Sequence, residues 1–177
     1  MRAFLFSLLC LVTGLATAAE PLDPDIGFFD ATLGDFQAEL ADARAQHKQG
    51  VLLIFEREGC PYCQRLRGNV LSQPVVQAYY HANFLVFPVD IDGDIEVTDF
   101  QGRTRRERQF AQDDNTVSAT PTCQFYDLNG RPVVRYTGAP SSVDEFLLLG
   151  EFVAQARYRD MNFSRYKQQR LEAKPTQ

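Results

Sequence analysis

Two cysteines three positions apart, Cys60 and Cys63, are the residues whose type and spacing most directly suggest chemistry. A Cys-x-x-Cys pair occurs in redox-active dithiols, in halves of zinc sites and at haem attachment sites. Haem attachment needs a histidine directly after the second cysteine, where this chain has Gln64. A zinc site needs two more ligands, and the candidates are scattered at Cys123, His47 and His81. The pair therefore indicates a redox-active dithiol or a structural disulfide, and no metal site is predicted.

The surroundings of the pair favour the redox-active dithiol. A continuous apolar run at 51–55 is typical of a strand buried on both faces, and Gly59 ends it. Pro61 is well suited to the first turn of a helix, so the pair opens that helix. Free N–H groups and the positive end of the helix dipole would stabilise a Cys60 thiolate and make it the attacking sulfur. Cys63, one turn inside the helix, suits the resolving role.

The cysteine pair is positioned by a predicted alternation of helices and strands. Apolar periodicity and turn residues predict helices at 32–47, 60–70, 74–82, 103–112 and 142–158, and strands at 51–55, 84–89, 122–127 and 132–137. Asn129-Gly130 predicts a tight turn that joins the last two strands into a hairpin. The order predicts one α/β domain with a mixed central sheet of about four strands flanked by helices.

Composition and the chain ends suggest a domain organisation. The 177 residues are 45% hydrophobic with a net charge of −5, which excludes a disordered chain and argues against nucleic acid as a partner. Residues 1–19 have the pattern of a secretory signal peptide, although an uncleaved membrane anchor is the alternative. We expect an irregular lead-in at 20–31, the domain at 32–158 and a polar, frayed extension at 159–177. Cleavage would remove Cys10 and release a soluble protein into the periplasm or another exported compartment.

Three features together resemble the thioredoxin superfamily. They are the buried strand at 51–55, the segment Glu58-Gly59-Cys60-Pro61-Tyr62-Cys63, and the segment Ser118-Ala119-Thr120-Pro121-Thr122 with a hairpin and a last helix after it. The resemblance covers about residues 33–158. The leader and the segments 55–60 and 89–94 look closest to the exported SoxW-type thioredoxin-like proteins.

The resemblance implies more than the spacing does. Thr120–Pro121 would be a cis peptide bond against the dithiol, and Thr120 and Pro121, with Pro61 and Tyr62, would bind substrate. The activity implied is reduction of disulfides in protein substrates, without a cofactor, by a monomer. A membrane thiol transporter would be the electron donor.

The sequence departs from the family at several points. Ile54 occupies the position of the thioredoxin buried acid, and Glu56, two residues on, is either a proton relay on the same face or a solvent-exposed strand end. The Pro-Tyr dipeptide between the cysteines is usual in glutaredoxins, so the redox potential cannot be transferred. Extra residues assigned to 90–102 form an insertion that could bear on partner choice. The direction expected is reducing, because Glu56 and Glu58 oppose the thiolate more closely than Arg65 and Arg67 favour it.

Weaker features leave alternatives open. Asp90, Asp92 and Asp94 are either a solvated acidic loop or a metal loop, and Arg103, Arg105, Arg106 and Arg108 are either an exposed helix face or a patch for an acidic partner. Cys123 is either a buried inert thiol or a third redox residue. For the whole protein, a soft-metal (copper) module using Cys60, Cys63 and Cys123 and a redox-inactive binding module are the competing functions.

Overall fold

The computed structural model describes residues 23–172. The predicted signal peptide at 1–19, with Cys10, lies outside the described residues, as do positions 20–22 of the lead-in and 173–177 of the extension. No helix within residues 23–172 is both long enough and apolar enough to cross a bilayer.

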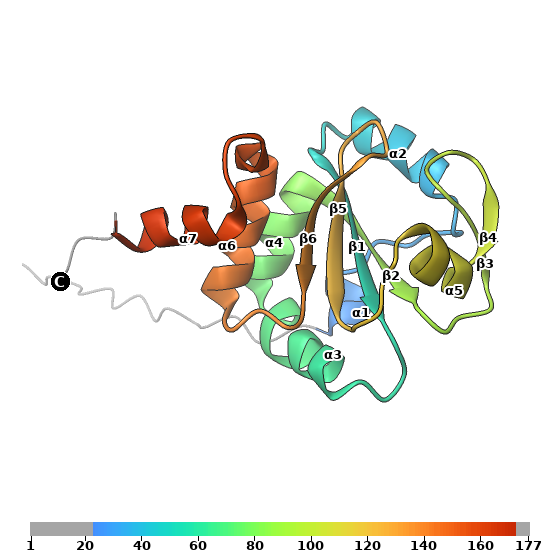
Figure 1. The fold of residues 1–177 in the computed structure, drawn as a ribbon, viewed down its shortest axis with the longest axis horizontal. Coiled ribbons are helices and arrows are strands. Elements are labelled where there is room, and N and C mark those ends of the chain that lie inside the picture. The colour runs from blue at the N-terminus through green and yellow to red at the C-terminus, as the bar shows by residue number, and fades with distance from the viewer. Residues whose placement is uncertain (1–22, 173–177) are drawn as a thin grey trace, which may run out of the picture.

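A mixed four-stranded sheet lies at the centre of the fold (Figure 1). Its strands are β1 (Gly50–Glu56), β2 (Phe84–Asp90), β5 (Thr122–Tyr126) and β6 (Pro132–Thr137), in the order β2-β1-β5-β6. β1 and β2 are parallel, and the other two neighbouring pairs are antiparallel. The predicted α/β architecture with about four mixed strands is confirmed.

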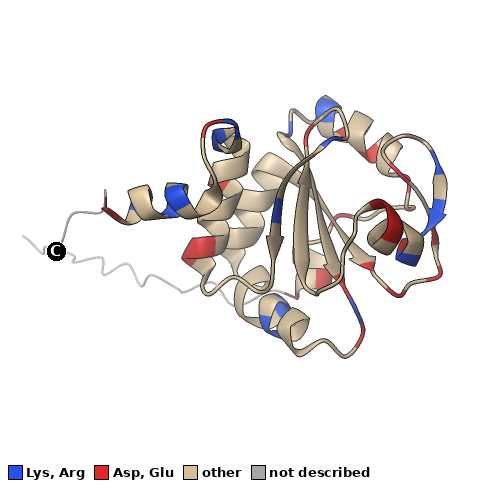
Figure 2. Ribbon diagram, in the orientation of Figure 1, with Lys and Arg blue, Asp and Glu red and all other residues tan. Residues whose placement is uncertain are grey.

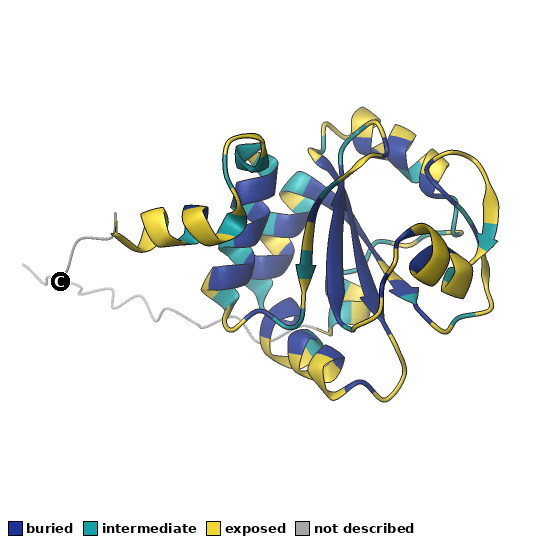
Figure 3. Ribbon diagram, viewed as in Figure 1, coloured by how far each residue is buried: buried dark blue, intermediate teal, exposed yellow. Residues whose placement is uncertain are grey.

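β1 is buried on both faces, as its apolar run predicted (Figure 3). Leu52 and Ile54 point into one hydrophobic cluster, and Val51, Leu53 and Phe55 point into the other. Charged residues of the central sheet lie only at strand ends and in β6 (Figure 2). Burial on both sides removes the choice of a polar face, so the strand carries no alternating pattern.

Helices cover both faces of the sheet (Figure 1). The helices and helical turns are α1 (Pro24–Gly27), α2 (Phe36–Ala45), α3 (Pro61–Leu66), η1 (Arg67–Leu71), α4 (Pro74–Asn83), α5 (Glu107–Gln109), η2 (Phe110–Asp114), α6 (Val143–Ala154), η3 (Arg157–Arg159) and α7 (Phe163–Glu172). Residues of α3, η1, α4, α6 and α7 share one cluster with the sheet, and residues of α2 and η2 share the other.

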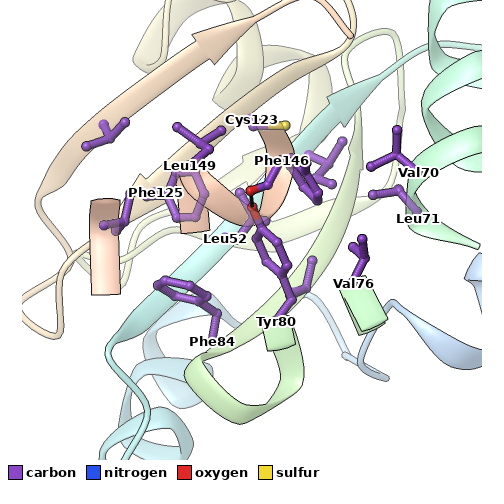
Figure 4. Close-up of a cluster of buried hydrophobic side chains, with 14 of the residues drawn as sticks. Leu52, Val70, Leu71, Val76, Tyr80, Phe84, Cys123, Phe125, Phe146 and Leu149 are labelled. Atoms are coloured by element: carbon purple, nitrogen blue, oxygen red, sulfur yellow. Dashed lines mark hydrogen bonds between the residues drawn. The ribbon is translucent and has the colours of Figure 1, made fainter. Parts of the chain in front are cut away.

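Tyr80 joins two helices within the larger cluster (Figure 4). Its ring stacks on Phe146 of α6 with centroids 4.3 Å apart. Its hydroxyl is fully buried and donates a 2.7 Å hydrogen bond to the Phe146 carbonyl oxygen. The bond satisfies a polar atom that would otherwise be costly to bury, so Tyr80 fixes α4 against α6.

The lead-in, expected to be irregular, contains the short helix α1, and α2 begins later than predicted. Asp30 accepts the Val86 N–H with its carboxylate at 2.7 Å and donates its own N–H to the Val86 carbonyl oxygen at 2.8 Å. This pairing covers the exposed edge of β2. α2 begins at Phe36 rather than at 32, because Gly34 has a φ of +81° and Asp35 caps the helix with its carboxylate.

The segment after β2 contains a small second sheet, formed where a polar loop (90–102) and the start of a helix (103–112) were predicted. β3 (Glu96–Thr98) pairs antiparallel with β4 (Thr104–Arg106), and α5 starts only at Glu107. The Asp99 carboxylate accepts N–H bonds from Gln101 and Arg103, which holds the turn between the two strands. The prediction of a helix from 103 is therefore wrong over β4, because Asp99 and the strand partner, neither visible in local periodicity, determine the conformation there.

Charged side chains of this segment form ion pairs with one another and with Arg57. The ion pairs join Arg57 to Asp92, Arg103 to Asp99, Arg105 to Asp114, and both Arg106 and Arg108 to Asp94. The exposed helix face predicted for the four arginines is wrong over β4. Asp92 and Asp94 lie in an exposed loop, as the solvated-loop interpretation expected, and each also pairs with an arginine.

The predicted frayed end is wrong for residues 163–172, because they form α7. Tyr166 of α7 is buried, with its ring 5.3 Å from that of Phe152 in α6. Phe163 packs against the same phenylalanine at 5.5 Å. The few apolar residues of this polar segment thus fall on one helical face, and that face packs on α6.

Candidate active site

Cys60 and Cys63 form a disulfide at the start of α3, with Cα atoms 5.3 Å apart. Cys60 is the N-cap residue of the helix, and its sulfur accepts the backbone N–H of Cys63 at 3.1 Å. The predicted placement at a helix N-terminus is confirmed. The two residues differ little in exposure, 7% for Cys60 and 4% for Cys63, so exposure does not distinguish them.

Thr120 and Pro121 lie against the Cys60 sulfur. The Thr120–Pro121 bond is cis, as the resemblance implied. The Thr120 hydroxyl donates to Cys60 Sγ at 3.3 Å, and the Thr120 carbonyl oxygen lies 3.6 Å from the same atom. Pairing of Phe55 with Thr122 between β1 and β5 brings these distant segments together. The sulfur therefore has two uncharged hydrogen-bond donors, one from its own helix and one from the loop before β5.

Glu56 ends β1 as a buried residue, so its interpretation as a solvent-exposed strand end is wrong. Its carboxylate accepts hydrogen bonds from Arg67 Nε at 2.9 Å and from Arg67 Nη2 at 2.6 Å. Burial raises the pKa of Glu56 above its ordinary value, and the Arg67 contacts only partly offset this rise. A raised pKa makes this carboxylate more basic than an exposed glutamate and so a better proton acceptor.

Arg67 is a site residue whose contacts the sequence analysis missed. Besides Glu56, it forms an ion pair with Asp25 of α1 and lies over the Phe29 ring at 4.8 Å. It had been expected to favour the Cys60 thiolate, but its charge is directed to two carboxylates instead. No local signal could reveal this, because the three partners come from residues 25–29 and from β1, whereas Arg67 itself lies in η1.

A cavity of about 560 Å³ adjoins the disulfide. Its walls include Glu56, Cys60, Cys63 and Arg67, and it is completed by the end of β2 and the segment before β3. The cavity brings the Glu56 carboxylate and Cys63 to the same space. A proton released from Cys63 could reach Glu56 there, directly or through water.

On its other side, the disulfide is flanked by the exposed face of α3. Pro61 is exposed, and Tyr62 is 56% exposed with the Arg65 guanidinium 4.3 Å above its ring. Another cavity, of about 320 Å³, lies between Tyr62, Arg65 and residues 139–143. The structure thus surrounds the disulfide with all four residues expected to bind substrate, Pro61, Tyr62, Thr120 and Pro121.

Cys123 is a free, fully buried cysteine on β5, paired in register with Ile54. Burial raises the pKa of its thiol strongly, and the nearby charge of Glu56 adds to the rise. A thiol held protonated is a poor nucleophile. Among residues 23–172, no group of three or more His, Cys, Asp or Glu side chains is arranged to hold a metal ion.

Comparison with known proteins agrees with this geometry. A thioredoxin from Thermus thermophilus shares 29% identity and a TM-score of 0.51, over 70% of this chain and 84% of that one. A thioredoxin-fold protein from Helicobacter pylori shares 23% identity and a TM-score of 0.56, over 72% of this chain and 82% of that one. A putative disulphide-isomerase from Bacteroides thetaiotaomicron shares 20% identity and a TM-score of 0.56, over 78% of this chain and 97% of that one.

The comparison with curated proteins gives no match. The model of the thioredoxin-like domain family, however, matches residues 36–154, which span β1, the Cys60–Cys63 pair, the Thr120–Pro121 bond and α6. The chain belongs to the thioredoxin-like domain family.

Proposed function

We propose that this protein is an exported thiol–disulfide oxidoreductase that reduces disulfides in polypeptide substrates. The observation that carries the proposal is the Cys60–Cys63 disulfide at the N-terminus of α3, with Thr120 in contact with Cys60 Sγ. A helix N-terminus and two hydrogen-bond donors stabilise negative charge on that sulfur. The same surroundings would serve a Cys60 thiolate in the reduced enzyme.

The reaction begins when the Cys60 thiolate attacks one sulfur of a substrate disulfide. A Cys60–substrate disulfide forms, and the second substrate sulfur leaves as a thiolate that takes up a proton. Cys63 then loses its proton and attacks Cys60 Sγ, which expels the first substrate sulfur as a thiolate. Two electrons have passed from the cysteine pair to the substrate. A dithiol donor must return them to the Cys60–Cys63 disulfide for the next cycle.

Glu56 is the proposed acceptor of the Cys63 proton. It shares a cavity with the pair, and burial raises its pKa toward the range in which it can take up and release a proton. Arg67 holds the carboxylate in place and keeps part of its negative charge compensated. Glu56 thus takes the part that the thioredoxin acid would have played at the position of Ile54.

Charge around Cys60 supports the reducing direction. Both hydrogen-bond donors to Cys60 Sγ are uncharged, and Arg67 is engaged with Glu56 and Asp25. A thiolate with little cationic support is less stabilised, which favours the disulfide and lowers the reduction potential. The leader at 1–19 and the resemblance to SoxW-type proteins support an exported, periplasmic location, with a membrane thiol transporter as the electron donor.

The decisive experiment is the reduction potential of the Cys60–Cys63 pair, measured by equilibration with dithiothreitol, together with insulin reduction. We expect a potential nearer to about −270 mV than to −120 mV, and dithiothreitol-dependent turnover that C60S abolishes. A potential near −120 mV with rapid oxidation of reduced, unfolded proteins would instead indicate an oxidant. Absence of turnover in either direction would favour the alternative function, a redox-inactive binding module. Copper retained by the purified reduced protein would indicate metal handling.

A further inference from the structure

The loop 138–142 forms one wall of the groove beside Tyr62. Residues 139–143 line the cavity of about 320 Å³ together with Tyr62 and Arg65. At its start, the loop is tied to the active site, because the Gly138 N–H donates to the Pro121 carbonyl oxygen at 2.8 Å. The position of this loop therefore sets the width of the space next to the reactive disulfide.

Glu145, in the first turn of α6, holds the other end of the loop. Its carboxylate accepts the Ser141 backbone N–H at 2.8 Å and also the Ser141 hydroxyl. Ser142 in turn caps α6 by accepting the Glu145 N–H at 3.1 Å. Burial alone would raise the pKa of Glu145, but its hydrogen bonds to Lys167 and Ser141 outweigh burial and lower the pKa to about 2. The loop is therefore held by an ionised, nearly buried carboxylate.

The cation opposite Glu145 comes from α7. Lys167 Nζ lies 2.7 Å from Glu145 Oε1, and Tyr136 of β6 also interacts with this carboxylate. α7 follows α6 and lies beyond the residues matched by the family domain, 36–154 (Figure 1). A helix outside the domain thus contributes the charge that keeps a groove-lining loop in place.

We propose that α7 positions the substrate groove through the chain of contacts Lys167–Glu145–Ser141, and so sets the affinity for polypeptide substrates. This inference rests on the proposed function, because it assumes that the groove beside Tyr62 receives the polypeptide next to the scissile disulfide. Lys167 and Glu145 are positioning residues, since neither lines the groove beside Tyr62 nor is in contact with the Cys60–Cys63 sulfurs.

The physical reason is the cost of an unpaired buried charge. Without Lys167, the Glu145 carboxylate, whose side chain is only 8% exposed, loses its cation, so it either takes up a proton or rotates toward solvent. Either change weakens the two hydrogen bonds from Ser141 and frees the loop. The sulfurs, Thr120 and Glu56 keep their own contacts, so the chemical steps are unaffected.

The test compares K167M and E145Q with wild type in steady-state reduction of insulin and of the small substrate hydroxyethyl disulfide. We expect the KM for insulin to rise by about three- to tenfold in both variants, with kcat and the rate with hydroxyethyl disulfide unchanged. K167R should restore the wild-type KM, because it restores a cation. R170M is the matched control, since it removes another cation of α7, whose ion-pair partner is Glu151 of α6 and not Glu145.

Amide exchange at Ser141 provides a readout that needs no activity. In K167M, the Ser141 N–H should exchange faster with solvent, while R170M should leave it unchanged. An unchanged insulin KM in K167M and E145Q would overturn the inference, and so would an equal loss with hydroxyethyl disulfide. Absence of wild-type turnover would refute the proposed function, and unchanged Ser141 exchange in K167M would then refute the positioning role separately.

Discussion

Arg67 donates hydrogen bonds to both carboxylate oxygens of Glu56, with Nε 3.2 Å from Oε1 and 2.9 Å from Oε2. The pair joins the end of β1 to the π-helical turn η1 that follows the active-site helix. Its second carboxylate, Asp25, comes from α1 at the start of the described chain. The position and charge of Glu56, a buried acid beside the cysteine pair, therefore depend on Arg67, which in turn is bound by Asp25 from the segment before the domain.

The first prediction concerns Glu56 as a proton acceptor. E56Q should slow resolution of the Cys60–substrate disulfide by about 10- to 100-fold at neutral pH, because Cys63 loses its base. Stopped-flow fluorescence or quenched-flow trapping of the mixed disulfide measures this step. Equal resolution rates in E56Q and wild type would remove Glu56 from the mechanism.

Replacement of Arg67 should change the pH dependence. A base must be ionised to act, so the rate rises as pH increases through the pKa of Glu56. R67M removes the hydrogen bonds and the cation that lower this pKa, so the acid limb of the pH–rate profile should move to higher pH. R65M removes the same charge from α3 without touching Glu56, and its acid limb should stay in place.

The roles of the two cysteines are tested by trapping. C63S should accumulate mixed disulfides with substrate proteins, because Cys60 attacks and nothing resolves the product. C60S should accumulate none. Non-reducing electrophoresis and mass spectrometry identify the adducts, and preferential alkylation of Cys63 in the reduced protein would reverse the assignment.

Thr120 should assist the Cys60 thiolate through its hydroxyl. T120A removes the donor at 3.3 Å from Cys60 Sγ, so the pKa of Cys60 should rise by less than about one unit and alkylation at fixed pH should slow. T120S keeps a hydroxyl at the same position and should behave like wild type. Iodoacetamide reactivity as a function of pH measures the pKa, and identical profiles for T120A and wild type would contradict the assignment.

Cys123 should matter for stability and not for turnover. C123A removes a fully buried sulfur and should lower the free energy of unfolding by about 1–2 kcal/mol. Its insulin-reduction rate should match that of wild type, because burial keeps this thiol protonated. Urea denaturation and the turnover assay check the two parts. A loss of turnover as large as that of C60S would make Cys123 a third redox residue.

Glu145 should make stability depend on pH in the acid range. Its folded pKa of about 2 lies below the ordinary value of 4.5, so its contribution is complete above pH 4.5 and is lost as the pH falls toward 2. We expect this contribution to be on the order of 2 kcal/mol, after allowance for solvent around Lys167. E145Q should be less stable than wild type at pH 7, and the difference should shrink by pH 3. Urea melts at both values test this, and a constant difference would contradict it.

Much of the fold follows from local sequence signals. The run at 51–55, the Asn129-Gly130 turn and the proline after Cys60 each act over a few neighbouring residues, and each element formed where it was predicted. The placement of the cysteine pair at a helix start is local for the same reason. It depends on a buried strand, a glycine break and a helix-initiating proline, all within residues 51–63.

Tertiary structure decided what depends on partners distant in the chain. Residues 104–106 form a strand because residues 96–98 pair with them. α7 is held as a helix because the rings of Phe163 and Tyr166 pack against Phe152 of α6. Whether Glu56 met solvent or was buried depended on the folded chain around the end of β1 and on Arg67, eleven positions away. Periodicity describes the preferences of one segment, whereas burial and ion pairing are set by the surfaces that the folded chain brings against it.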